Sequence, residues 1–118
     1  NAADLKSARD SSPAGFNRAV GAHGYHIQQR WYEEAHMAVA GHELESFKFI
    51  VVDVAPPHVV GVYDLDFMWH ENAMGKTARA RETYRECEAR DVWPGYGAMA
   101  LPAPTWAVYE DDDEEMQI

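Results

Sequence analysis

Apolar residues recur along the chain with two different spacings, which together predict a mixture of helices and strands. A first helix is expected from Pro13 to about Val20, because Ser12 can cap its start and proline fits the first helical position. Glycines at positions 21 and 24 interrupt the chain, and a second helix is expected through roughly Val39, ending at Gly41. Spacings of three and four give this second helix one continuous face, made of Tyr25, Gln28, Tyr32, Ala35 and Val39.

Two later segments are rich in β-branched and aromatic residues and predict strands. The first spans residues 47–54 and is stopped by the prolines at 56 and 57. The second spans residues 59–65, and the short connection between the two favours an antiparallel pair. Residues 2–6 alternate weakly and are interpreted as the end of a further strand.

A long helix is expected after the last of these strands. Asp66 can cap it, and the helix should run from Phe67 to about Arg90, where the sequence Trp93-Pro94-Gly95-Tyr96 ends it and packs its end onto the sheet. Its inward face is predicted to carry Ala73, Thr77, Ala80, Tyr84 and Cys87. Six consecutive acids at 110–115 predict a solvated tail, so we expect one domain over residues 1–107 and a disordered acidic tail over 108–118.

The length and the net charge of the chain exclude some classes of function. It has 118 residues and a net charge of -10, a field that repels nucleic acid, so a site for a polyanion must be local and assisted by a metal cation. The single cysteine, Cys87, cannot form an internal disulfide, and no apolar run is long enough for a membrane span, so we expect a cytoplasmic protein. The chain begins with Asn1 instead of Met and is interpreted as a piece of a longer protein.

An acid and an amine near the start of the chain are the first candidates for chemistry. Asp4 and Lys6 lie two positions apart in the predicted strand and therefore point to the same side. A carboxylate can hold a hard divalent cation, while a lysine steadies an attacking hydroxide or the charge of a phosphate. A solvated ion pair is the alternative, because Asp-x-Lys triplets occur by chance in most proteins.

The second helix adds a second pair. Gln28 and Tyr32 lie one helical turn apart on the same face, where an amide and a phenol could hold a phosphate or the edge of a nucleotide. The alternative is a tyrosine of the hydrophobic core beside a glutamine that bonds to the backbone.

Other polar residues are given structural interpretations. The six histidines lack a second pair at zinc-ligand spacing and are expected on the surface. Asp53 is expected as an acid at the end of a strand. The arginines of the long helix are expected to form a solvated face interleaved with glutamates, and they are Arg79, Arg81, Arg85 and Arg90.

Several short motifs occur in a fixed order along the chain. They are Asp4-Leu5-Lys6, Arg9-Asp10-Ser11-Ser12-Pro13 with Phe16, Tyr25-His26-Ile27-Gln28 with Trp31-Tyr32, the segments 49–54 and 59–65 around Pro56-Pro57, and Tyr84, Cys87 and Trp93-Pro94-Gly95-Tyr96. Over about residues 3–107 this order resembles the carboxy-terminal nuclease domain of RecE-type exodeoxyribonucleases (exodeoxyribonuclease VIII). These enzymes belong to the PD-(D/E)XK superfamily, in its branch with a Gln-x-x-x-Tyr helix. The resemblance implies an α/β fold, a restriction-endonuclease-like core fragment with a mixed sheet flanked by helices.

The resemblance also implies roles for individual residues. Asp4 would ligate the catalytic Mg²⁺, or Mn²⁺ in its place, with the Leu5 carbonyl as an additional ligand. Lys6 would position or activate the water that attacks the phosphodiester, and Gln28 and Tyr32 would contact the substrate strand. The first metal-binding aspartate of the superfamily would precede Asn1, so this fragment alone is expected to be inactive.

By the same resemblance the intact parent is a magnesium-dependent exodeoxyribonuclease. It would digest one strand from double-stranded DNA ends for phage-type recombination, with a single-strand annealing protein of the RecT kind as partner, and would be a homo-oligomer. The rival interpretation is a noncatalytic nuclease-like module for DNA binding or assembly. The third interpretation is a small α/β domain whose motif matches are accidental.

Overall fold

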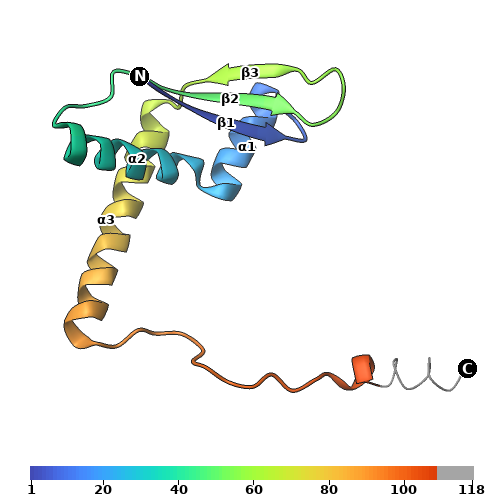
Figure 1. Ribbon diagram of the computed structural model, residues 1–118, viewed down its shortest axis with the longest axis vertical. Helices are drawn as coiled ribbons and strands as arrows, with labels where there is room; N and C mark the ends of the chain where they lie inside the picture. The colour runs from blue at the N-terminus through green and yellow to red at the C-terminus, as the bar shows by residue number, and fades with distance from the viewer. Residues whose placement is uncertain (109–118) are drawn as a thin grey trace, which may run out of the picture. The chain divides into compact units, whose positions relative to one another are not determined.

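The computed structural model describes residues 1–108, which form a mixed sheet with helices (Figure 1). The elements follow in the order β1 (Ala2–Ala8), α1 (Pro13–His23), α2 (Tyr25–Ala40), β2 (Phe47–Asp53), β3 (Val60–Tyr63) and α3 (Phe67–Arg90). This is the α/β class that the sequence predicts, with β1 longer than expected.

The sheet has the strand order β1-β2-β3. β2 and β3 pair antiparallel, as predicted, whereas β1 pairs with β2 in parallel. A parallel pair needs a long crossover, and α1 and α2 supply it. The register places Asp4 opposite Phe49 and Lys6 opposite Val51.

The hydrophobic core lies on the helix-covered face of the sheet. Phe49 and Val51 are 0% exposed and pack with Phe16 and Val20 of α1. Residues opposite each other on paired strands share a face, so Asp4 and Lys6 point to the same side as Phe49 and Val51. The sheet register therefore turns both polar side chains toward the helices.

The turn into α1 explains why the chain reverses directly after β1. Ser12 caps the helix as predicted, its hydroxyl accepting a hydrogen bond from the Gly15 N–H at 3.1 Å. Hydrogen bonds from the side chain and backbone of Ser12 lower the pKa of Asp10 below its usual range, and the nearby Arg18 charge adds to this effect. Glycine fits position 15 because a Cβ there would lie 2.7 Å from the Asp10 carbonyl oxygen.

The buried face of α2 differs from the face that the sequence predicts. Its buried residues are His26 and Gln29, whereas Tyr32 is 48% and Val39 91% exposed, so the predicted continuous apolar face is wrong beyond the second turn. His26 is no surface histidine either, because its Nε2 lies 2.8 Å from Asn72 Oδ1 on α3. The position of α3 decides which side of α2 is covered, and the spacing of apolar residues along α2 gives no information about that position.

α3 begins as predicted, with the Asp66 carboxylate accepting a hydrogen bond from the Trp69 N–H at 3.1 Å. Ala73 and Thr77 are buried on its inward face, but Tyr84 is 58% exposed, so that face is shorter than expected. The solvated interpretation of Arg81 is wrong, because its guanidinium pairs with Glu34 of α2 and lies 5.1 Å from the Trp31 ring centroid.

The chain divides into two compact units, Asn1–Glu86 and a second that begins at Cys87. In the second unit Tyr96 is 99% exposed. The expected packing of this segment on the sheet stays a prediction. A single helical turn spans 105–108, and the rest of the expected acidic tail lies outside the described residues. Across residues 1–108, no helix is long and apolar enough to cross a membrane.

Candidate active site

Asp4 and Lys6 form an ion pair on the helix-facing side of β1. Lys6 Nζ lies 3.2 Å from Asp4 Oδ2, and the two side chains are only 17% and 20% exposed. The freely solvated pair considered from the sequence is therefore wrong. A pair that is largely shielded from water interacts more strongly than one at the surface, because the effective dielectric constant around it is lower.

Gln28 completes this contact from α2. Lys6 Nζ donates a hydrogen bond to Gln28 Oε1 at 2.8 Å, across 22 positions of sequence. The alternative in which this glutamine bonds only to backbone is thus wrong. The amide end of Gln28 has two N–H donors beside the oxygen that Lys6 occupies. The strand and the helix therefore bring a carboxylate, an ammonium and an amide together at one point.

Tyr25 is a fourth member that sequence reasoning did not assign to the site. Lys6 Nζ lies 4.4 Å from the centroid of its ring, within the range of a cation–π contact. The ring is fixed in turn by stacking on Phe16 at 5.8 Å. Tyr25 and Gln28 are three positions apart and therefore lie on the same face of α2. This spacing is the signal that could have identified Tyr25 as a member of the site.

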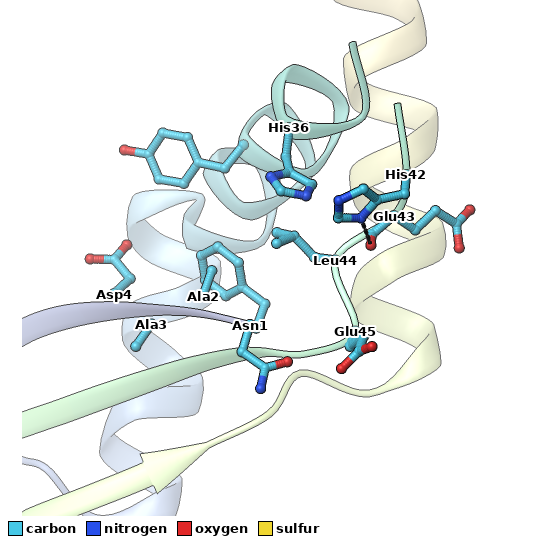
Figure 2. Close-up of a pocket in the computed structure, with 11 residues that line it drawn as sticks. Asn1, Ala2, Ala3, Asp4, His36, His42, Glu43, Leu44 and Glu45 are labelled. Atoms are coloured by element: carbon cyan, nitrogen blue, oxygen red, sulfur yellow. Dashed lines mark hydrogen bonds between the residues drawn. The ribbon is translucent and has the colours of Figure 1, made fainter. Parts of the chain in front are cut away.

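Tyr32 is joined to the site through a shared cavity. A pocket of about 880 Å³ is lined by both Asp4 and Tyr32 (Figure 2). The Tyr32 ring stacks on Phe47 with centroids 6.3 Å apart, yet the residue is 48% exposed, so it is not the core tyrosine of the alternative interpretation. Asp4, Lys6 and Gln28 thus meet by direct contact, and Tyr32 faces the same cavity as Asp4.

Leu5 lies between the two polar residues and faces the other way. Its side chain is 71% exposed on the opposite face of the sheet. Ala2 N–H donates to Ser46 and the Ala8 carbonyl accepts from Val54, so the even-numbered residues of β1 bond to β2. Because this pattern alternates in a parallel ladder, the Leu5 carbonyl points away from β2, toward the outer edge of β1.

The donor set bears on which metal the site could hold. Within residues 1–108 no group of three His, Cys, Asp or Glu side chains is placed to hold a metal ion. Mg²⁺, however, is commonly bound through one or two carboxylates, with water and substrate phosphates completing its shell. The Asp4 carboxylate and the Leu5 carbonyl offer hard oxygen donors of this kind, so these residues fit a part of a magnesium shell.

Asp53 has a structural role, as expected. Its carboxylate accepts a hydrogen bond from the Ala55 N–H at 3.1 Å and closes the turn after β2. This contact keeps Asp53 at the strand end.

A comparison with models of protein families gave a match. The model of a family described as "PDDEXK-like domain of unknown function (DUF3799)" matches residues 1–101. A search of the curated proteins gave no match to the chain. The matched segment contains β1 and α2, the two elements that carry the site.

Proposed function

Because the chain belongs to this PDDEXK-like family, we propose that the full-length protein is a metal-dependent exodeoxyribonuclease of the RecE type. One observation carries the proposal: Lys6 is held between Asp4 at 3.2 Å and Gln28 at 2.8 Å on the sheltered face of the sheet. A carboxylate can hold a divalent cation, and an ammonium beside it can stabilise the charge that develops on a phosphate during hydrolysis.

Asp4 and the Leu5 carbonyl would hold Mg²⁺, or Mn²⁺ in its place. The ion, when bound, polarises the phosphate and makes a bound water more acidic. A site built on carboxylates and a cation needs no basic surface, which agrees with a net charge of -10.

Lys6 would act on the phosphate or on the attacking water. Its ammonium has three N–H donors. Asp4 and Gln28 take two of them and fix the direction of the third. The Tyr25 ring also restricts the position of the ammonium, because its centroid lies 4.4 Å from Lys6 Nζ. A donor fixed before the reaction costs little reorganisation as charge develops on the phosphate.

Gln28 would contact the DNA strand through its amide N–H groups, since its oxygen already accepts from Lys6. Tyr32 would contact the same strand from the cavity that it shares with Asp4. In this proposal the substrate is a double-stranded DNA end, and the full-length protein acts as a homo-oligomer in the cytoplasm. Digestion of one strand exposes the other, which is bound by an annealing protein of the RecT kind.

Digestion of linear and of covalently closed circular duplex DNA tests the proposal directly. The full-length protein with Mg²⁺ should release acid-soluble nucleotides from the linear form only, and chelation with EDTA should stop the release. Equal digestion of both forms would contradict an exonuclease. No digestion of either form would favour the noncatalytic module.

A further inference from the structure

The cavity beside Asp4 has a flat aromatic surface that is open on one side. Tyr32 and Phe47 both line it, and their rings are nearly parallel, 22° apart, with centroids 6.3 Å apart. One face of the Tyr32 ring thus lies against Phe47, while the residue remains 48% exposed. A second flat ring can therefore stack on the outer face of Tyr32.

The charges that line this cavity exclude most other ligands. Three of its lining side chains are carboxylates, those of Asp4, Glu43 and Glu45, and none is Lys or Arg. Away from Lys6, which does not line the cavity, such a lining repels a phosphate or a carboxylate. Apart from the Mg²⁺ proposed at Asp4, no metal ion is expected to fill the cavity, because no three ligating side chains gather in the described part of the chain. A neutral ring fits best, and about 880 Å³ is within the range of ~300–1,000 Å³ for small-ligand pockets.

His36, one of the residues that line this cavity, has a polar atom without a hydrogen-bond partner. His36 Nε2 is buried and makes no hydrogen bond, and burial of an unpaired polar group is unfavourable. The exposed His42 ring stands edge-on to His36 with centroids 5.0 Å apart. Figure 2 shows both imidazoles on the side of the cavity away from Asp4. Movement of the His42 side chain would allow a ligand to bond to His36.

We propose that this cavity binds an unstacked nucleobase from the DNA strand whose phosphate lies at Asp4 and Lys6. The inference rests on the proposed nuclease function and adds to it a site for the base. The base stacks on Tyr32, and its polar edge bonds to His36 once His42 has moved. Stacking on an aromatic side chain accepts any base, and a bond to its edge distinguishes one base from another.

The test compares DNA ends with and without a base. Fluorescence anisotropy with Ca²⁺ in place of Mg²⁺ measures the binding of the full-length protein to duplexes with two unpaired nucleotides, normal or abasic, at the 5′ or the 3′ end. The normal overhang should bind about five- to a hundredfold more tightly than the abasic one at one of the two ends.

Variants assign this preference to the cavity. Tyr32→Phe should keep the preference for the normal overhang, whereas Tyr32→Leu should bring the ratio of the two affinities near one. His36→Phe should keep the preference for a base but remove differences among the four bases. Tyr96→Leu, at a tyrosine that is 99% exposed, is the matched control and should change nothing. Thermal unfolding of each variant verifies that it is folded.

The outcomes separate this inference from the proposed function. If the wild-type protein digests linear DNA but binds normal and abasic overhangs equally, the base site is wrong and the nuclease proposal stands. A folded Tyr32→Leu variant with the full preference for a base would also overturn the base site. If the protein neither binds nor digests DNA, the proposed function itself fails.

Discussion

Replacement of Asp4 by asparagine is expected to lower the rate of magnesium-dependent DNA digestion by about a hundred- to a thousandfold. Asparagine keeps the size of the side chain and removes the charge that attracts the cation. Gln28 still accepts from Lys6 at 2.8 Å, so the ammonium stays near its position. The measurement is the rate of nucleotide release from linear duplex DNA by the full-length protein over a range of Mg²⁺ concentrations.

Asp64→Asn is the matched control for this variant. Asp64 also pairs with a lysine, since its Oδ2 lies 2.6 Å from Lys48 Nζ. Lys48 alternates along β2 with the buried Phe47 and Phe49 and so faces the other side of the sheet. The control should digest DNA at the wild-type rate. Full activity of a folded Asp4→Asn variant would contradict the role of Asp4.

Replacement of Lys6 by methionine is expected to reduce digestion by a similar factor, roughly a hundredfold or more. Methionine keeps a long, flexible stem against the Tyr25 ring and removes the donor that serves the phosphate or the water. Removal of the ammonium also leaves the Asp4 carboxylate without its competing cation at 3.2 Å. Metal binding should therefore be retained or tightened in this variant, whereas Asp4→Asn should weaken it.

The two variants are separated by measuring Mn²⁺ binding by electron paramagnetic resonance beside the digestion rate. Lys48→Met, at the lysine of the control pair, should leave both quantities unchanged. If Lys6→Met lost metal binding together with activity, its effect would be on the structure of the site, and the proposed action on phosphate or water would be wrong.

The parts of this site that follow from local periodicity could be predicted from the sequence. Alternation along a strand placed Asp4 and Lys6 on one side, and the helical repeat placed Gln28 and Tyr32 on one face. The caps at Ser12 and Asp66 depend only on neighbouring backbone, and both are present.

The parts that depend on tertiary packing could not be predicted. Periodicity shows which residues share a face, but the neighbouring element decides which face is covered. α3 approaches α2 at His26 through Asn72, which buries His26 and leaves Val39 exposed. The cation–π contact between Lys6 and Tyr25, and the approach of His42 to His36, likewise join residues from different segments.

The most direct test of the central claim is a crystal structure of the full-length protein with Mn²⁺ and a short DNA end, with the ion located by anomalous scattering. We expect the ion in contact with the Asp4 carboxylate at about 2.1 Å, and a phosphate oxygen within hydrogen-bond reach of Lys6 while Gln28 still holds that lysine. An ion bound away from Asp4, or DNA lying on a surface remote from Lys6 and Gln28, would contradict the claim.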